Sequence, residues 1–212
     1  MDITWLGHSC FRIDGRGVSI LTDPFPPGLG LPPYRETPSI VTVSNSHPNH
    51  SYTDGAQGNP RLLTRPGQYE ISGAYIQAFR TSLREGDILV PRNTVFLMKI
   101  EDIVVCHLGD LGAVPTSKLM EELSQAQVLL IPAGGGCTIE VAQVVEIVHL
   151  IQPRVVIPMH YQIAGAATEM GSVDAFLGEM GARESQPVAR LSLSATSLPA
   201  DTRVVLMAPP GT

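Results

Sequence analysis

Histidine and aspartate residues recur in this chain directly after predicted β-strands. Loops at one edge of a sheet converge in space, so five separate segments can supply side chains to one pocket. The residues, each with the strand it follows, are His8 after residues 3–5, Asp23 after 18–22, His47 and His50 after 40–43, His107 and Asp110 after 103–106, and His160 after 155–158. The pattern predicts a sheet protein with a polar site along one edge. A sixth histidine, His149, lies inside a predicted helix without such companions and receives no role.

Strands dominate the first half of the chain, and helices enter only in the second half. Short β-rich runs separated by turns predict an antiparallel or mixed sheet up to residue 100. Later apolar strands alternate with helices expected over 116–123 and 139–151, the second with Thr138 as its N-cap. This order of elements indicates an α/β sandwich rather than an all-β barrel. The predicted strands are 3–5, 10–13, 18–22, 40–43, 61–64, 75–79, 94–100, 103–106, 128–131, 155–158, 190–193 and 203–207.

The composition is that of a globular chain without an obvious macromolecular partner. With 212 residues, 43% of them hydrophobic, the chain is expected to form a single domain over 1–212. The net charge of −6 and only 14 scattered Lys and Arg residues argue against nucleic-acid binding. No apolar run reaches the ~20 residues of a membrane span and the start does not resemble a signal peptide, so a cytoplasmic location is expected. The three cysteines, Cys10, Cys106 and Cys137, are expected to be reduced and buried.

Two irregular segments have more than one interpretation. Residues 24–38 hold six prolines and form either a loop over the site or a surface insertion. The glycines at 134–136, before the predicted helix, form either an anion cradle or a tight turn without a ligand.

Six short segments together resemble a known family. They are 5–11 (WLGHSCF), 23–25 (DPF), 44–50 (SNSHPNH), 107–112 (HLGDLG), 132–136 (PAGGG) and 158–161 (PMHY). In this order they resemble the metallo-β-lactamase superfamily, and most closely its Zn-dependent hydrolases related to the bacterial L-ascorbate-6-phosphate lactonase. The resemblance covers about residues 2–162. It implies a four-layer αβ/βα sandwich with the site on one edge of the two sheets.

The resemblance also implies a metal motif that is only partly kept. The family motif His-x-His-x-Asp-His corresponds here to Asn45, His47, Asn49 and His50. No histidine lies between His50 and His107, so a third ligand of the first metal is missing as well. His47 is then the only imidazole left for the first metal, which is expected to be absent.

A second metal position keeps more of its ligands. By resemblance it retains the ligands His50, Asp110 and His160, which could bind one zinc ion. The same three ligands could also bind iron or manganese. The reaction is expected to depend on Asp110, His50 and Asn49, although an amide at position 49 cannot act as a general base. We expect four further residues to orient the metal ligands or the substrate: His8, Asp23, Asn45 and His107.

Two interpretations of the function remain open. The first is a hydrolase with at most one metal, acting on a small ester, lactone or phosphorylated metabolite. The second is a catalytically degenerate, metal-free relative that serves as a binding or scaffolding module. A redox use of a lone iron ion is a third and weaker hypothesis.

Overall fold

The first of two sheets is built from the N-terminal segment of the chain. The computed structural model describes residues 1–86 and 88–208. Alternate residues are buried along the first strand, as expected where one face of a sheet covers the core. The strand order is β12-β1-β2-β3-β4-β5. The bounds are β1 (Asp2–Gly7), β2 (Cys10–Gly15), β3 (Val18–Thr22), β4 (Ile40–Thr42), β5 (Arg61–Leu63) and β12 (Leu191–Ser192).

The second sheet combines a long antiparallel hairpin with parallel strands, in the order β13-β11-β10-β9-β8-β7-β6. All five residues of β10 and of β11 are buried, which explains why these parallel strands read as uninterrupted apolar runs. The bounds are β6 (Gly67–Ile71), β7 (Ala74–Glu85), β8 (Ile88–Ile100), β9 (Ile103–His107), β10 (Val128–Pro132), β11 (Val155–Met159) and β13 (Arg203–Val204).

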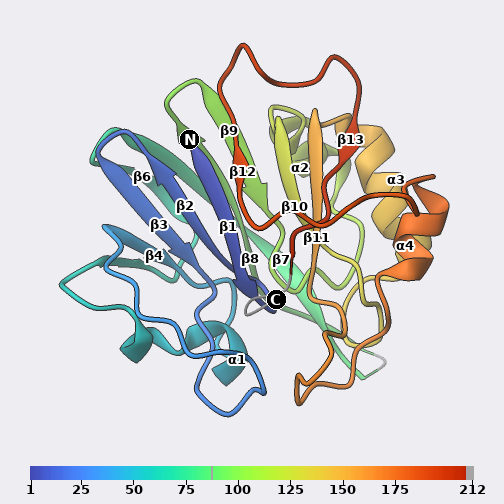
Figure 1. Cartoon of the computed structure of the whole chain (residues 1–212), viewed down its shortest axis with the longest axis horizontal. Helices are drawn as coiled ribbons and strands as arrows, with labels where there is room; N and C mark the ends of the chain where they lie inside the picture. Colours follow the sequence, from blue (N-terminus) through green and yellow to red (C-terminus); the bar gives the residue numbers. More distant parts are fainter. Residues whose placement is uncertain (87, 209–212) are drawn as a thin grey trace.

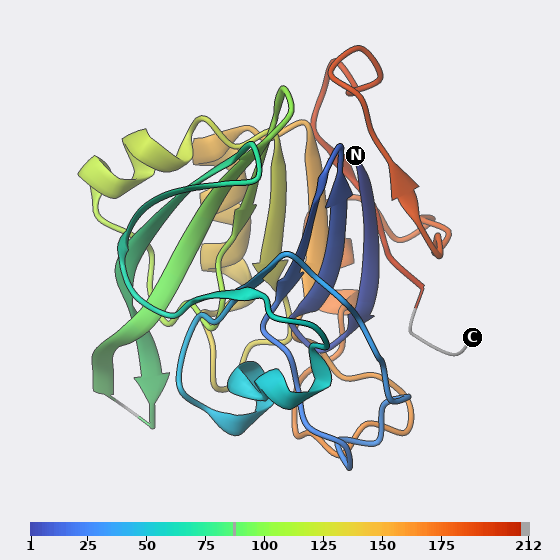
Figure 2. The same ribbon diagram turned by 90° about the vertical axis from the view of Figure 1, so that its left-hand side faces the viewer.

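Helices flank the two sheets and complete the sandwich (Figures 1 and 2). The helices α3 and α4 pack against each other on the outside of the second sheet, whereas the short α1 lies at one end of the first sheet (Figure 1). This arrangement confirms the predicted αβ/βα sandwich. The bounds are α1 (Pro48–Ser51), α2 (Ser117–Leu123), α3 (Val141–Ile151) and α4 (Asp174–Glu179).

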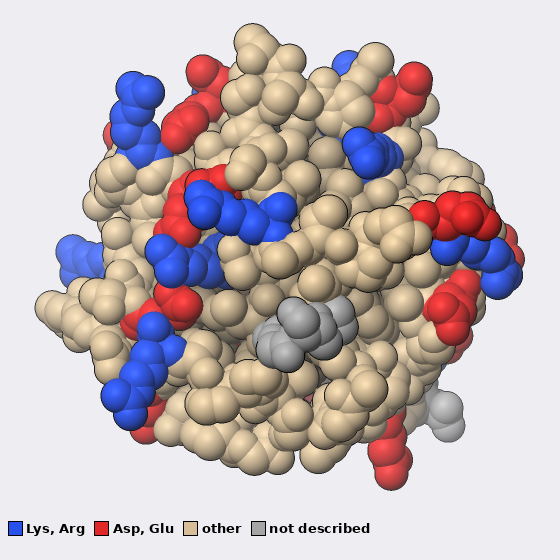
Figure 3. Space-filling view, viewed as in Figure 1, with Lys and Arg blue, Asp and Glu red and all other residues tan. Residues whose placement is uncertain are grey.

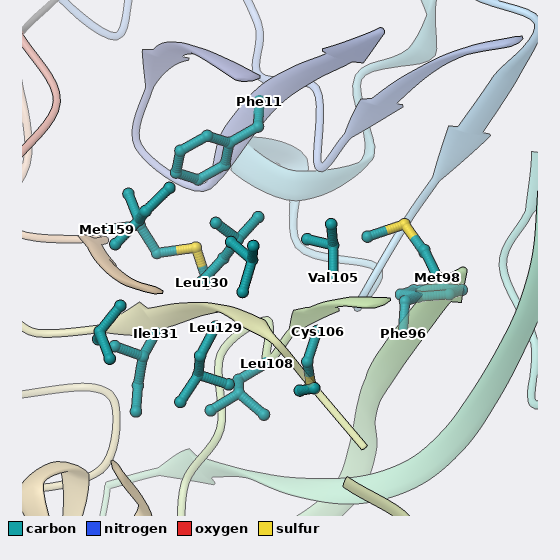
Figure 4. Packing of buried hydrophobic residues seen from close by; sticks show 14 of the residues in the cluster. Phe11, Phe96, Met98, Val105, Cys106, Leu108, Leu129, Leu130, Ile131 and Met159 are labelled. Atoms are coloured by element: carbon teal, nitrogen blue, oxygen red, sulfur yellow. The ribbon is translucent and has the colours of Figure 1, made fainter. Parts of the chain in front are cut away.

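Side chains from both sheets form the core between them (Figure 4). Phe11 points from β2 of the first sheet toward Leu130 and Met159 of the second, and all three are fully buried. Truncating a side chain of this kind to alanine typically costs about 2–5 kcal/mol. The core thus fixes the two sheets relative to each other, and with them the loops at the sheet ends.

Several predicted boundaries are wrong. The helix α3 begins at Val141 with Glu140 as its N-cap, and Thr138 instead donates its hydroxyl to the carbonyl of Gly135. The hairpin strands β7 and β8 extend well beyond the predicted 75–79 and 94–100, because backbone pairing continues through polar residues such as Arg80 and Thr94. The strand β6 and the helix α4 were not predicted.

Cys137 corrects the prediction for the cysteines. Cys10 and Cys106 are buried as expected, whereas Cys137 is exposed. It follows directly on the turn of Gly135 and Gly136, both with positive φ, and this turn carries it to the surface rather than into the core.

The surface carries no single-sign face in the view of Figure 1. Acidic and basic side chains are interspersed there (Figure 3). Among the described residues, no helix has both the length and the apolar character needed to cross a lipid bilayer.

Candidate metal centre

A cleft of about 460 Å³ is lined by residues of α1 and of the loops that follow β1, β4, β9, β10 and β11. The ends of β7 and β8 contribute Leu83, Arg84, Glu85 and Arg92 to its lining. The volume is that of a typical small-molecule site. Four residues at its base have predicted functional roles: His8, His50, Asp110 and His160.

The backbone is strained where it presents two of these residues. His8 and His160 have φ angles of 53° and 52°, a left-handed conformation that L-residues other than glycine seldom adopt. The carbonyl of His8 accepts hydrogen bonds from the indole of Trp5 at 3.0 Å and from the amide of His160 at 3.1 Å. The two histidines, which come from different sheets, are therefore held together through the main chain.

The side chains of the four residues converge. Nε2 of His50 lies 2.9 Å from Oδ2 of Asp110, and Nε2 of His160 lies 3.2 Å from Oδ1. One ring nitrogen from each of His8, His50 and His160 lies within 4.8 Å of the others. All three histidines are buried, so the cluster is a compact set of nitrogen and oxygen donors.

Asp23 fixes the orientation of His50 by contacting the ring nitrogen that points away from Asp110. Its Oδ2 lies 2.8 Å from Nδ1 of His50, and its two oxygens accept hydrogen bonds from the amide of Ser44 at 2.7 Å and from its hydroxyl at 2.5 Å. Asp23 is fully buried and also has a positive φ of 38°. A carboxylate on one ring nitrogen holds the other nitrogen toward the cleft, as in many metal sites.

The protonation states of His8 and His160 suit metal binding. Burial lowers the pKa of His8 to about 2, with help from the neighbouring His160 and His50. Burial likewise lowers the pKa of His160, so its 3.2 Å contact with Asp110 involves a neutral ring and is not an ion pair. Neutral imidazoles keep a lone pair on one nitrogen, which a metal ion requires.

His50 differs from the other two histidines because it lies between two carboxylates. Burial alone would lower its pKa, but Asp110 and Asp23 outweigh burial and raise the pKa to about 10. Burial likewise opposes ionisation of Asp110, yet His50 holds the pKa of that carboxyl well below its ordinary range. The proton on His50 thus supplies positive charge that a divalent cation could supply instead.

Unpaired polar atoms show that the residues fit a metal ion. Nδ1 of His8 and Nδ1 of His160 are buried without a hydrogen-bond partner, and Oδ1 of Asp110 is also buried without a hydrogen bond, since its 3.2 Å contact with Nε2 of His160 does not have hydrogen-bond geometry. Buried polar atoms are nearly always paired, so three such atoms in one cluster indicate a missing partner. Imidazole nitrogens with a carboxylate oxygen are a donor set suited to zinc or divalent iron.

The two asparagines of the motif have different surroundings. Asn45 is buried, donates its amide to Oδ2 of Asp110 at 3.1 Å and accepts the amide of His47 at 2.9 Å. It therefore supports the carboxylate that faces the histidines. Asn49 is half-buried and lines the cleft.

His47 and His107 do not belong to the convergent set of histidines, although the ring centroid of His47 lies 6.2 Å from that of His50. His47 is exposed, lines the cleft and accepts the amide of Asn49 through Nδ1 at 3.2 Å, which makes it the N-cap of α1. His107 is fully buried, with Nε2 2.9 Å from the carbonyl of Ser9 and Nδ1 accepting the amide of Gly109 at 3.2 Å. Both nitrogens of His107 are thus engaged by the main chain.

The glycine turn after β10 also supports the site. A Cβ at Gly134 would lie 2.5 Å from the carbonyl of His160, so only glycine allows this close approach. Residues 24–38 contribute less directly: none lines the cleft, but the carbonyl of Leu29 accepts the amide of Ala167 at 2.8 Å, and Ala167 lines it. The proline-rich segment therefore braces a cleft loop instead of covering the site.

A family model described as a β-lactamase superfamily domain matches residues 2–160. The chain belongs to this superfamily. The resemblance of the six sequence segments is thereby confirmed at the level of the superfamily and of the fold. The narrower likeness to L-ascorbate-6-phosphate lactonases stays a prediction.

Individual relatives cover about three quarters of the chain or more. A UPF0173 protein of Pyrococcus abyssi is 32% identical in an alignment 208 residues long that covers 86% of this chain and 92% of the relative. A UPF0173 metal-dependent hydrolase of Methanopyrus kandleri is 30% identical in an alignment 194 residues long that covers 76% of this chain and 84% of the relative. A crystal structure from Thermotoga maritima, assigned to the Zn-dependent hydrolases of the metallo-β-lactamase superfamily, has a TM-score of 0.80, 37% identity and 97% coverage of both chains. The chain is thus a member of a family of metal-dependent hydrolases.

Some cleft residues of this superfamily member carried no recognisable sequence signal. Arg84 and Arg92 reach the cleft from the β7–β8 hairpin, and Glu169 reaches it from the loop after β11. Neither segment has a motif of its own, and the strand pattern did not show that the hairpin extends this far. Cys137 also lines the cleft, and its place after the glycine turn could have indicated this.

The buried His107 makes stability depend on pH. Burial lowers the pKa of folded His107, whereas the unfolded chain takes up a proton near a pKa of about 6.5. Below that pH the unfolded state binds more protons, so stability falls as pH falls. This residue should remove up to about 1 kcal/mol between about pH 7 and pH 5.5. Urea unfolding at both pH values should show a smaller pH difference in His107→Gln, and no change in the exposed control His149→Gln.

Proposed function

We propose that this chain is a hydrolase that uses one divalent metal ion held by His50, Asp110 and His160, with His8 completing the set. The observation that supports it is the buried cluster in which Asp110 faces two histidines while three polar atoms stay unpaired. Zinc is the first candidate, and iron or manganese would also accept these donors. We further propose that the protein acts in the cytoplasm on a small ester, lactone or phosphorylated metabolite.

Residues around the proposed metal ion have separate roles in the reaction. A divalent metal, when bound, polarises a carbonyl or phosphoryl oxygen and lowers the pKa of water. Asp23 keeps the imidazole of His50 turned toward the cleft, and Asn45 holds Asp110 by its Oδ2. Asn49 at the cleft wall can donate and accept hydrogen bonds but cannot take up a proton near neutral pH.

Metal analysis together with ester hydrolysis tests this proposal. Protein purified without chelator should contain close to one equivalent of zinc, iron or manganese, and should hydrolyse simple activated esters such as p-nitrophenyl butyrate. His160→Ala should lower both the metal content and the hydrolysis. A protein that binds none of these metals after they are supplied would contradict the proposal.

Restoring a carboxylate at position 49 should increase the rate. General-base assistance is typically worth a factor of about 10²–10⁴, so Asn49→Asp should raise kcat for p-nitrophenyl butyrate at least about tenfold. Asn59→Asp, at an exposed position outside the cleft, adds the same charge and should leave kcat unchanged. An equal response of the two variants would mean that the effect is only one of net charge.

A second candidate function is a metal-free binding module. The hydrogen bond from Asn45 to Asp110 favours it, because an amide here engages the carboxylate where the family motif has a histidine. Turnover in the wild type that is abolished by His160→Ala would reject this candidate. Absence of turnover and of bound metal would support it.

A further inference from the structure

Arginine residues gather beside the metal centre although the chain as a whole is acidic. The net charge is −6, and Lys and Arg together number only 14. Three arginines of the β7–β8 hairpin nevertheless line two adjoining clefts: Arg84 and Arg92 line the metal cleft, and Arg80 and Arg92 line a second cleft of about 290 Å³. The two clefts share Asn45, Ser46 and Arg92.

The strand pairing places Arg80 on one face of the hairpin, and Arg92 lines the same cleft. Arg80 pairs directly with Thr94, so their side chains point to the same side. Arg92 lies where the pairing register shifts opposite Thr81 and Leu83, and it lines the second cleft together with Arg80 and Thr94. Arg84, beyond this bulge, lines the metal cleft.

The second cleft is rich in hydrogen-bond donors. Among the residues that the structure describes, its lining includes the hydroxyl-bearing residues Ser46, Thr64 and Thr94 and the amide-bearing Asn45, but no Asp or Glu. Arg80 has no ion pair among the described residues, and its Nη1 donates only to the carbonyl of Pro91 at 3.3 Å. The guanidinium of Arg80 is therefore open to a ligand.

The ion pair of Arg92 is weak. Its Nη1 lies 3.1 Å from Oε1 of Glu85, and the side chains of Arg92 and Glu85 are 65% and 46% exposed. Solvent-exposed pairs of this kind contribute little, so an anionic ligand can replace Glu85 at small cost. Guanidinium groups bind phosphate and carboxylate through two parallel hydrogen bonds, which matches a pair of arginines facing one cleft.

We propose that Arg80 and Arg92 form a subsite for an anionic group of the substrate, a phosphate or a carboxylate at the end remote from the bond that is cleaved. The inference rests on the proposed hydrolase function and adds the class of substrate. A molecule that places its reacting bond at the metal centre would reach the second cleft past Asn45 and Ser46, which line both.

An NMR titration of the whole 212-residue chain, as purified, tests the subsite without relying on turnover. The probes are n-propyl phosphate and butanoate, which carry the two candidate anions on the same alkyl chain. The variants are the double variant Arg80→Gln/Arg92→Gln, the control Arg203→Gln at the far edge of the second sheet, and His160→Ala. The anion that binds more tightly to the wild type identifies the preferred group.

The expected result is a dissociation constant at least about tenfold higher in the double variant, since charge-assisted hydrogen bonds are lost. The constant should be unchanged in Arg203→Gln and in His160→Ala. Binding that is lost in His160→Ala but kept in the double variant would place the anion on the metal and overturn the proposal. Failure of both probes to bind the wild type would overturn it too.

Comparing the hydrolysis of two esters, one with and one without a distal carboxylate, tests whether the subsite selects the substrate. The ratio of kcat/KM for mono-p-nitrophenyl glutarate to that for p-nitrophenyl butyrate should fall in the double variant, because only the first ester carries a distal carboxylate. An unchanged ratio would contradict the subsite. If neither ester is cleaved, the hydrolase proposal fails, while the titration still decides whether the arginines bind the anion.

Discussion

Replacing Asp110 by alanine should empty the metal centre and reduce ester hydrolysis by at least about 100-fold, since metal activation supplies several kcal/mol. The carboxylate of Asp110 contacts His50, His160 and Asn45 together. Its removal deletes an oxygen donor and leaves the proton of His50 without its nearest partner. Metal content by mass spectrometry and kcat/KM for p-nitrophenyl butyrate would measure both effects.

Two further variants make the Asp110 result interpretable. Asp102→Ala removes an exposed aspartate from the turn between β8 and β9, away from the cleft, and should change neither quantity. Asp110→Asn keeps the size of the side chain and guards against an effect of unfolding alone. Full metal content and full hydrolysis in both Asp110 variants would exclude this residue from the centre.

Replacing Asp23 by alanine should destabilise the fold by about 3–5 kcal/mol, the typical cost of breaking a buried charged pair. Asp23 is fully buried and accepts hydrogen bonds from the amide and the hydroxyl of Ser44, at 2.7 and 2.5 Å, besides its contact with His50. Alanine leaves these groups without a buried partner. Urea unfolding would give the free energy, and the melting temperature should fall by about 6–20 °C.

The same substitution should also weaken metal binding. Loss of a carboxylate that orients a ligating histidine typically lowers metal affinity about 10–100-fold. Asp23→Asn keeps one oxygen for Ser44 and should therefore lose less stability than Asp23→Ala. A free energy of unfolding within about 1 kcal/mol of the wild type for Asp23→Ala would show that this network contributes little.

The sequence predicted the sheets and the edge on which the site lies for a physical reason. Strand ends along one edge of a sheet meet in space whatever their separation in the chain, and the structure brings His8, His50, Asp110 and His160 together there. The ring centroids of His8 and His160 lie only 4.4 Å apart. Strand periodicity could not predict this close approach. That approach depends on two left-handed backbone conformations, which histidine rarely adopts.

Features set by backbone pairing or by a local turn were less predictable. The hairpin of β7 and β8 continues through Arg80 and Arg84 because main-chain hydrogen bonds do not need apolar side chains. Thr138 fits an N-cap by residue type, yet its hydroxyl is used by the glycine turn and the helix starts later. Cys137 reaches the cleft through the same turn, which composition alone does not reveal.

A crystal structure of protein purified without chelator, with anomalous diffraction data, tests the central claim most directly. The account predicts one anomalous peak per chain among His50, Asp110 and His160, with His8 beside it, at an absorption edge that identifies the metal. Zinc and iron should both be supplied to any crystals that lack a peak. A site that still shows no peak, with Nε2 of His50 remaining against Asp110, would contradict the account.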